Sequence, residues 1–428
     1  MVQLHELINR DIVCSCGRTH RCDIPALRIG RNALDDLPAL LGDFRHVLLV
    51  ADKNTDAVAG RRVRALLGGR LDAEIVFDTG EDLLVPDEKS IRAIEERLTA
   101  RTDLVLGIGS GVVNDLCKYV SFYHGLKSGI VATAPSMDGY ASSGAAMILS
   151  GMKVTATTHA PVLILGDVDV LASAPMDMIR SGYADIIGKY SALSDWRLSE
   201  LVNGEYLCPY VYGIVMERTN DLRDLAPRIA ARDGDAIGAL METLVLVGVC
   251  LTLLSTTRPG SGSEHHMSHY FEITGLIDGA PYFPHGTDVG YATVVTAEMR
   301  ERIRSVDSPV FHKISDEARF RAYERIYKGL APEVKALQDG TRRYENSVDG
   351  VYREKWDEIR EILAECPTAD EIGEMLLAVG FDLSAFERLY GAKKIKNGTW
   401  FAKDLKDRYS VLWLYAELFL TEEEARSV

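Results

Sequence analysis

The feature that most constrains the fold is an alternation of short apolar runs with longer polar stretches of helical periodicity, which continues to about residue 165. Helical patterns occur, for example, at 89–99 and 114–123. Such an alternation predicts a parallel sheet covered by helices on both faces. The apolar runs that we interpret as its strands are 47–50, 74–77, 104–107, 129–132 and 162–165.

Beyond Asp169 the strand signals fade and helical patterns dominate, as at 235–254 and 352–365, with Pro367 and Gly380 as expected helix stops. We therefore predict an α/β, Rossmann-like dinucleotide-binding domain with a parallel sheet over residues 1–170. An all-α domain that binds metal and substrate is predicted over 171–428. The apolar stretch 243–255 is shorter than the roughly 20 residues of a membrane-spanning helix, so we expect a buried core helix and no membrane span.

Charge and cysteine usage exclude some classes of protein. Lys and Arg number 48 against 63 Asp and Glu, and the resulting net charge of −15 argues against a nucleic-acid partner. The first residues, MVQLHE, lack the features of a signal peptide, and seven cysteines fit a reducing cytosol, so we expect a cytoplasmic protein. Cys14, Cys16 and Cys22 surround His20, but no partner motif follows at zinc-finger spacing, and a structural or surface role is favoured.

Two loops follow predicted strands. Gly107, Gly109 and Gly111 precede a predicted helix, and this pattern leaves phosphate binding and a simple tight turn about equally open. The second loop, 133–143, is rich in hydroxyl groups around Asp138. It could be an ordinary turn-rich loop, but its place at the end of a strand favours function. Asp52 also ends a strand and could bind a ribose diol.

The histidines suggest a metal site. His265 and His269 share one face if their segment is helical, and His285 follows twenty residues after His265. Asp185 is a carboxylate in a mostly apolar segment, which is costly unless it is paired or bound to a cation. Asp185, His265 and His285 would form a catalytic type of site with open coordination. The alternative is that these are core and surface histidines that never meet.

Taken together, these stretches resemble the bacterial type of sn-glycerol-1-phosphate dehydrogenase. That family belongs to the superfamily of dehydroquinate synthases, glycerol dehydrogenases and iron-type alcohol dehydrogenases. The resemblance covers most of the chain, whereas 300–390 carries no usable motif. The matching blocks are GIGSGVVNDLCK (107–118), TAPSMDGYASS (133–143), GYADIIGKYSALSDW (182–196), RPGSGSEHHMSH (258–269), FPHGTDVGYAT (283–293) and, more weakly, KDRYSVLWLYAEL (406–418).

The resemblance implies an NAD- or NADP-linked enzyme of phospholipid metabolism that interconverts dihydroxyacetone phosphate and sn-glycerol 1-phosphate. Asp138 and His269 would contact the substrate. One divalent metal (zinc, nickel or iron) would be held by Asp185, His265 and His285. The implied cofactor contacts are Asp52 near the adenosine ribose, Gly111, Val112, Val113, Asn114 and Asp115 under the pyrophosphate, and Thr133, Ser136 and Ser142.

The chain departs from the archaeal pattern at Met137, where archaeal members usually carry His, and at Lys189, where they tend to carry Asn. Both departures favour the bacterial branch. Of the doublet at 265 and 266, the first histidine is chosen, because the superfamily uses the first His of H-x-x-x-H. Relatives commonly form homodimers, so a homodimer is expected. The candidates for binding the substrate phosphate are Arg258, Lys393, Lys394 and Arg408.

Other functions stay open from the sequence. The nearest is a different activity of the same superfamily, either that of a glycerol dehydrogenase or that of a dehydroquinate-synthase-like enzyme. A non-catalytic metabolite-binding protein is the alternative from another class, although a decayed site would be expected to lose a metal ligand.

Overall fold

The structure is a computed structural model that describes residues 2–80, 84–149 and 152–428. The chain divides into two compact units. The first comprises residues 1–186 and 220–257, and the second comprises 187–219 and 258–428. Besides residues 1–170, the first unit contains residues 171–186 and a helix from the middle of the chain, 234–254.

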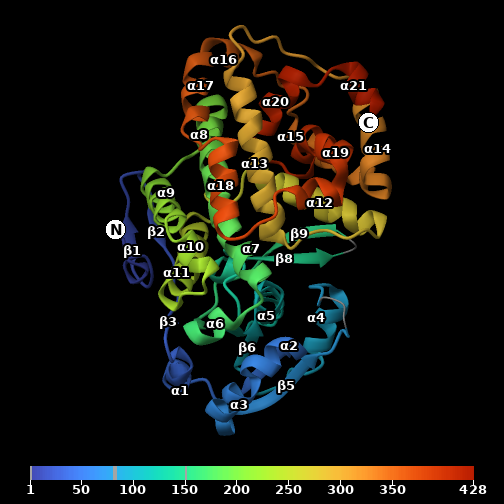
Figure 1. The fold of residues 1–428 in the computed structure, drawn as a ribbon. Coiled ribbons are helices and arrows are strands. Elements are labelled where there is room, and N and C mark those ends of the chain that lie inside the picture. Colours follow the sequence, from blue (N-terminus) through green and yellow to red (C-terminus); the bar gives the residue numbers. More distant parts are fainter. Residues whose placement is uncertain (1, 81–83, 150–151) are drawn as a thin grey trace. The chain divides into compact units, whose positions relative to one another are not determined.

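The first unit is built on a six-stranded sheet in which every neighbouring pair is parallel (Figure 1). All five predicted runs are strands, which confirms the prediction of a parallel sheet. The strand order is β3-β10-β7-β6-β4-β5. The bounds are β3 (Ala26–Gly30), β4 (Val47–Asp52), β5 (Leu71–Phe77), β6 (Leu104–Gly109), β7 (Lys127–Ala132) and β10 (Leu163–Asp167).

Side chains of alternate strand residues point to opposite faces of this sheet. On one face, Leu49, Leu106 and Leu165 belong to a buried cluster with Val63 of α3 (Arg61–Leu67). On the other face, α5 (Gly111–Tyr123) packs so closely on β6 that a Cβ on Gly107 would lie 3.0 Å from Val113. Helices therefore cover both faces, as the alternation predicts.

The order of the strands defines where a ligand would bind. From β4 the chain moves to one side to form β5 and then returns to form β6 on the other side of β4. In open α/β sheets, such a reversal leaves a crevice beyond the carboxyl ends of the two strands. Asp52 ends β4, and Gly109 ends β6, so the predicted ribose carboxylate and the glycine loop flank this point.

The edge strand β3 of the parallel sheet was not predicted. Two antiparallel hairpins in the first unit were also not predicted: β1 (Asp11–Val13) with β2 (Thr19–Arg21), and β8 (Gly144–Leu149) with β9 (Met152–Thr157). The strands β1 and β2 are three residues long and mostly exposed, so they carry little apolar periodicity. The remaining α-helices of this unit outside 220–257 are α1 (Leu37–Leu40), α2 (Lys53–Thr55), α4 (Glu88–Glu95), α6 (Val168–Ser173) and α7 (Met176–Ile187).

The long apolar helix α11 (Gly234–Leu254) extends beyond the 243–255 stretch recognised in the sequence. By length and composition it could cross a membrane, yet 72% of its most apolar window is buried inside the protein. This burial agrees with the expected core helix.

The second unit contains only helices among its described residues, as predicted. The predicted helix 352–365 is two helices, because Lys355 between them has non-helical angles (φ −109°, ψ 23°). Helix α18 begins after Pro367 and ends before Gly380, which has φ +86°. The helices from here to the C-terminus are α14 (Asp316–Tyr327), α15 (Ala331–Thr341), α16 (Asp349–Glu354), α17 (Trp356–Ala364), α18 (Ala369–Ala378), α19 (Ser384–Phe401), α20 (Val411–Phe419) and α21 (Glu422–Ser427).

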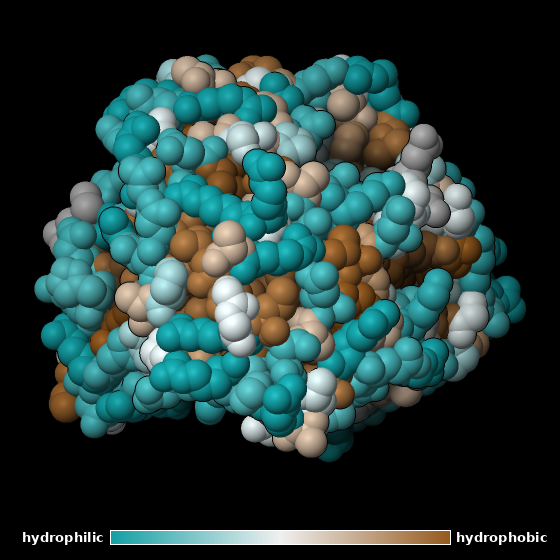
Figure 2. All heavy atoms as spheres, turned by 90° about the horizontal axis from the view of Figure 1, so that it is seen from below, coloured by the Kyte–Doolittle hydropathy of each residue, from teal (hydrophilic) through white to brown (hydrophobic). Residues whose placement is uncertain are grey.

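Earlier in the chain, α8 (Lys189–Asn203) lies in the second unit, while α9 (Pro209–Arg223) crosses from the second unit into the first and α10 (Ala226–Ala230) follows in the first. Hydrophilic side chains dominate the face drawn in Figure 2, and apolar groups lie between them. A mixed surface of this kind is ordinary for a folded chain, since polar atoms alone cannot cover it.

Candidate active site

The glycine loop connects β6 to α5. A Cβ on Gly109 would lie 2.5 Å from the Cβ of Val113, so this glycine is required for the close approach of α5 to the sheet. Gly111 begins α5, and helix geometry leaves the first N–H groups of such a helix without intrahelical partners. Together with the helix dipole, these N–H groups form a site suited to a phosphate. The glycines thus serve packing, and the approach of a phosphate stays a prediction.

A fully buried lysine joins α5 to the loop that follows β7. Lys118 Nζ donates to the carbonyl of Gly139 at 3.0 Å and lies 2.9 Å from Asp115 Oδ1 and 3.3 Å from Ser142 Oγ. The other oxygen of Asp115 accepts from the N–H of Ala146 at 3.0 Å. The side chains of Asp115 and Ser142 therefore contribute to this joint. Sequence reasoning gave Lys118 no role, although a lysine on a helix after a glycine loop is a usable signal.

Two glycines hold the loop that carries Asp138. A Cβ on Gly182 of α7 would lie 1.8 Å from the carbonyl oxygen of Pro135, and a Cβ on Gly248 of α11 would lie 2.6 Å from that of Asp138. Both helices therefore pack directly on the loop backbone. One turn after Gly182, the fully buried Asp185 accepts a hydrogen bond from the N–H of Asp138 at 3.0 Å. The structure thus brings Asp138 and Asp185 together.

Other predicted cofactor residues lie at or after strand ends of the same sheet or, like Asn114, in the first turn of α5. Thr133 donates its N–H to the carbonyl of Gly109 at 3.0 Å, and Ser136 is buried with its carbonyl accepting from Ser181 Oγ at 3.2 Å. Asp52 begins α2, where its Oδ1 accepts from the N–H groups of Asn54 and Thr55 at 2.8 and 3.0 Å. Asn114 is buried, with its side-chain amide 3.4 Å from the carbonyl of Gly139. Their contacts with a cofactor stay predictions.

In the second unit, α12 (Ser263–Asp278) and α13 (His285–Arg304) bring three imidazoles together. The ring centroids of His265 and His285 are 5.0 Å apart, those of His269 and His285 are 5.5 Å apart, and those of His265 and His269 are 6.5 Å apart. Two imidazoles that bind one ion at metal–nitrogen distances of about 2.1 Å place their centroids roughly 5 Å apart. The His265–His285 pair therefore fits a divalent metal.

Neighbouring side chains orient these rings. Nδ1 of His265 lies 2.7 Å from Glu264 Oε1, and since a carboxylate only accepts, Nδ1 carries the proton and Nε2 keeps its lone pair. Nδ1 of His285 lies 3.2 Å from Ser268 Oγ. Burial by itself raises the pKa of Glu264, but hydrogen bonds from His265 and from the N–H of Gly262 hold that pKa below its usual value. Glu264 was missed in the sequence, although an acidic residue directly before a ligand histidine is a recognisable signal.

His266 has a different environment. It is fully buried, and burial followed by the positive charges of Lys406, Arg408 and Arg258 lowers its pKa well below the usual value. Among the described histidines, the one whose ring faces His269 and His285 is His265. This supports the choice of the first histidine of the doublet.

The cations near His266 form a cluster, which we call the basic cluster: Arg258, Lys406 and Arg408. Arg408 donates to the carbonyl of Ser261 at 3.0 Å, and Lys406 Nζ lies 3.5 Å from the hydroxyl of the same residue, just before α12. Arg258 is buried and pairs with Glu205. Removal from water and then the charge of Arg258 lower the pKa of Arg408 to about 10.

The other two candidates for binding the substrate phosphate, Lys393 and Lys394, lie on α19. Lys393 is exposed, and Lys394 is 3.9 Å from Asp278. Neither has a contact with the basic cluster among the interactions that the structure describes.

A buried ion pair fixes the start of α12. Asp195 and Arg300 are 2.8 Å apart and almost inaccessible to solvent. Asp195 also accepts from the N–H of Ser263, the first residue of α12, at 2.6 Å and from that of Val411, the first residue of α20, at 2.9 Å. The helix that carries His265 and His269 is thereby held to a rigid support.

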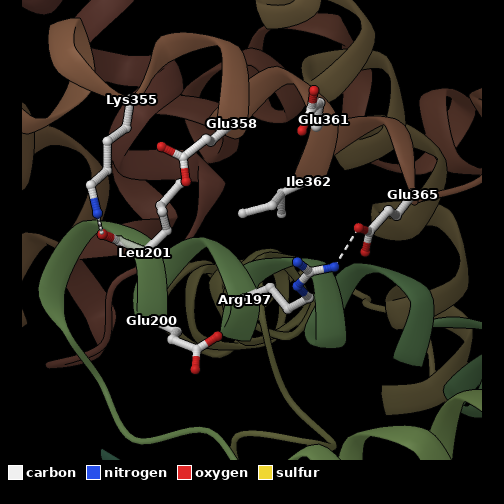
Figure 3. A pocket seen from close by; sticks show the side chains of 8 residues that line it. All are labelled: Arg197, Glu200, Leu201, Lys355, Glu358, Glu361, Ile362 and Glu365. Carbon is white, nitrogen blue, oxygen red and sulfur yellow. Dashed lines mark hydrogen bonds and ion pairs between the residues drawn. The ribbon is translucent and has the colours of Figure 1, made fainter.

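A surface pocket elsewhere in the second unit contains none of the predicted site residues (Figure 3). It is rich in glutamates, and its arginine, Arg197, pairs with Glu365 across the opening. We do not place the active site there. The residues that line it are Arg197, Glu200, Leu201, Lys355, Glu358, Glu361, Ile362 and Glu365.

Comparisons with known proteins define the class of protein. The model of the iron-containing alcohol dehydrogenase family matches residues 28–175. The alcohol dehydrogenase ADH/D1 from an archaeal halo-thermophile of a Red Sea brine pool is similar with a TM-score of 0.59 at 14% identity, over 95% of this chain and 97% of that one. Glycerol dehydrogenase from Schizosaccharomyces pombe is similar with a TM-score of 0.55 at 16% identity, over 86% of this chain and 92% of that one. The fold is that of iron-containing alcohol dehydrogenases.

Sequence relatives narrow this class. Glycerol-1-phosphate dehydrogenase (NAD(P)+) of Halalkalibacterium halodurans is 36% identical over 70% of this chain and 79% of that protein. The enzyme of the same name from Geobacillus stearothermophilus is 28% identical over 98% of this chain and 99% of that protein. The chain belongs to the glycerol-1-phosphate dehydrogenase family and is therefore an NAD(P)-linked oxidoreductase.

Proposed function

We propose that this protein interconverts dihydroxyacetone phosphate and sn-glycerol 1-phosphate by metal-dependent hydride transfer with NAD or NADP. The names of its relatives support the substrate pair. The observation that carries the proposal is the basic cluster of Arg258, Lys406 and Arg408, which contacts or neighbours Ser261 immediately before the helix of His265 and His269.

A phosphorylated substrate accounts for this cluster. Arg258 is already paired with Glu205, but the lowered pKa of Arg408 shows that partial removal from water and the nearby charge of Arg258 still disfavour its charged form. A further anion that joined Lys406 and Arg408 would offset this cost. A phosphate can accept hydrogen bonds from Arg and Lys and also benefits from the N-terminal end of α12. An unphosphorylated polyol has no negative charge with which these cations could pair.

We assign roles by combining the family resemblance with the local geometry. The metal ligands would be Asp185, His265 and His285, and the imidazole pair has the spacing and the lone-pair orientation that a divalent ion requires. Asp138 and His269 would contact the substrate. The cofactor would be bound by Asp52, by Gly111, Val112, Val113, Asn114 and Asp115 at the start of α5, and by Thr133, Ser136 and Ser142.

When bound, a zinc, nickel or iron ion supplies stabilisation of the negative charge on the reacting oxygen, while the nicotinamide carries the hydride. The residues of the chain orient these groups. Glu264 keeps the proton of His265 on Nδ1, and the N–H groups at the start of α5 offer donors for the pyrophosphate. His269 lies one helical turn beyond His265 and would hold or relay the proton of the substrate hydroxyl.

The test is to measure oxidation of NADH and NADPH with dihydroxyacetone phosphate and with dihydroxyacetone, after loading with zinc, nickel or iron. We expect turnover only with the phosphorylated ketone and a metal, and a product that is the sn-1 enantiomer. Equal turnover of both ketones would favour a glycerol dehydrogenase, and formation of a cyclised product from a sugar-acid phosphate would favour a dehydroquinate-synthase-like enzyme. Absence of oxidation with every metal would favour a non-catalytic binding protein.

Variants test the basic cluster itself. We expect Lys406→Ala and Arg408→Ala to raise KM for the phosphorylated ketone about 10- to 100-fold, because each removes a charge-assisted hydrogen bond. Lys393→Ala is the matched control, since it removes an exposed lysine outside the cluster. Equal KM values in all three variants would contradict the assignment of the phosphate site.

We further propose a cytoplasmic homodimer without a partner nucleic acid. Light scattering coupled to size-exclusion chromatography would measure the mass of the assembly against the 47.2 kDa of one chain.

A further inference from the structure

The turn between β1 and β2 carries two cysteines, Cys14 and Cys16, whose sulfur atoms lie close together. The N–H of Cys14 donates to the carbonyl of Arg18 at 3.0 Å, and the N–H of Gly17 donates to the carbonyl of Cys14 at 3.1 Å. Gly17 has φ +83°, a left-handed conformation that glycine adopts at low cost. These bonds close the turn around Cys16, and both cysteines are half-buried. One short turn therefore holds two thiol groups close together.

A buried histidine faces these thiols. His20 in β2 is 2% exposed, and its Nδ1 lies 3.1 Å from the carbonyl oxygen of Leu253, near the end of α11. Because a carbonyl only accepts, the proton is on Nδ1, and Nε2 carries the lone pair. That Nε2 lies 3.3 Å from Cys16 Sγ. Anchoring of one ring nitrogen by a backbone carbonyl, with the other turned towards thiolates, is how metal-binding histidines are commonly held.

We propose that Cys14, Cys16 and His20 bind a zinc ion. Their ligand atoms lie within 4.8 Å of one another. In a tetrahedral site with zinc–sulfur bonds of about 2.3 Å and a zinc–nitrogen bond of about 2.1 Å, neighbouring sulfur and nitrogen ligands are roughly 3.6 Å apart. Binding forms two sulfur–zinc bonds and one nitrogen–zinc bond, and the two thiol protons pass to solvent. The fourth position is filled by a donor from outside the hairpin or by water.

Such a site would stabilise a hairpin that is too small to be stable by itself. Two three-residue strands cannot hold their shape in water without further support, and the only buried side chain in these strands is His20. Zinc would fasten the turn to His20, and His20 is itself bound to the end of α11. Figure 1 shows the hairpin beside that helix. This zinc would be structural, and it shares no ligand with the proposed catalytic metal of Asp185, His265 and His285.

Metal analysis of protein purified under reducing, oxygen-free conditions tests the proposal. We expect wild-type protein to keep about one zinc per chain that the double variant Cys14→Ser/Cys16→Ser lacks. Cys22→Ala is the matched control, because this buried thiol lies in the same segment but outside the cluster, and it should keep the ion. A His265→Ala/His285→Ala variant should also keep it, which separates this site from the catalytic one. Equal zinc in wild type and the double variant would overturn the proposal.

Two measurements on the wild type do not depend on the folding of a variant. After replacement of zinc by Co²⁺, we expect a thiolate-to-cobalt charge-transfer absorption. Mass spectrometry of alkylated peptides should show Cys14 and Cys16 protected with zinc bound and modified after chelation. Absence of the absorption, or equal alkylation with and without zinc, would show that the two cysteines are not ligands.

Discussion

The two units of this enzyme provide their parts of the proposed site by different physical means. In the first unit the relevant groups are mainly backbone: the start of α5, and a loop on which Gly182 and Gly248 allow two helices to pack. In the second unit they are side chains, with three imidazoles and three cations around the start of α12. Substitutions should therefore act through shape in the first unit and through charge and coordination in the second.

The two units also differ in the hydrogen bonds that hold these parts in place. The loop of Asp138 is held mostly by bonds to its carbonyl groups, as from Lys118 and Tyr140. Both units bury an ion pair, but Lys118 of the first unit's Lys118–Asp115 pair donates to loop carbonyl groups, whereas Asp195 of the second unit's Asp195–Arg300 pair accepts from backbone N–H groups and so anchors the start of α12. A buried ion pair is costly to break, because it leaves one charge without its partner.

The largest expected effect is loss of the imidazole pair. His265→Ala/His285→Ala should lower kcat/KM by more than roughly 1,000-fold, because the metal would lose two of its three protein ligands. His312→Ala, which removes an exposed histidine of the same unit, should leave activity unchanged. Turnover and metal content are measured together. Full activity of the double variant would refute the metal assignment.

A shape effect of nearly the same size is expected in the first unit. Gly182→Ala would push a methyl group against the carbonyl of Pro135, and we expect a loss of about 3 kcal/mol of unfolding free energy together with most activity. Gly213→Ala is the control, because its added Cβ meets nothing within 4 Å in helix α9. That change should stabilise the protein by up to about 1 kcal/mol. Denaturant titration measures the unfolding free energy of both variants. Equal values for the two would contradict this prediction.

A smaller effect is expected where the second unit orients a ligand. Glu264→Gln keeps the shape of the side chain but loses the charge that fixes Nδ1–H of His265, so metal affinity should fall about 10- to 100-fold. The apparent affinity is read from the recovery of activity as metal is added back to chelated enzyme. Glu324→Gln on the exposed side of α14 is the control. If both variants recover activity at the same metal concentration, Glu264 does not act by orienting His265.

The smallest effect is expected from Glu417, a half-buried acid of α20. Burial, followed by the negative charge of Asp349, raises the pKa of Glu417 to about 7. The unfolded chain loses this proton near its ordinary pKa of 4.5, so the stability that the protonated group contributes is complete below that pH and is lost as pH rises to about 7. Glu417→Gln should therefore raise Tm by roughly 2 °C at pH 8, with the difference shrinking towards pH 5. A constant difference across this range would contradict the shifted pKa.

Much of the fold and several site residues could be predicted from local patterns. Apolar runs such as 104–107 are strands because a parallel sheet buries them on both faces, and Pro367 and Gly380 flank α18 because neither continues a helix. The hairpin of β1 and β2 could not be predicted, since strands as short and as exposed as these carry no period. The hairpin of β8 and β9 was missed although buried and half-buried residues alternate in the first half of β8. Glu264 and Lys118 were missed because their roles depend on which atoms they meet in space.

By itself, the sequence determined five of the six strands of the parallel sheet, the family, and the residue types available for catalysis, because periodicity and motif spacing are local properties of the chain. Only the tertiary structure decided that Gly182 must lack a side chain, that His265 and not His266 faces the other imidazoles, and that Arg408 and Lys406 meet at Ser261. It also joined His20 to Leu253, which are 233 residues apart. Such contacts follow from packing, which brings together atoms whose separation along the chain carries no signal.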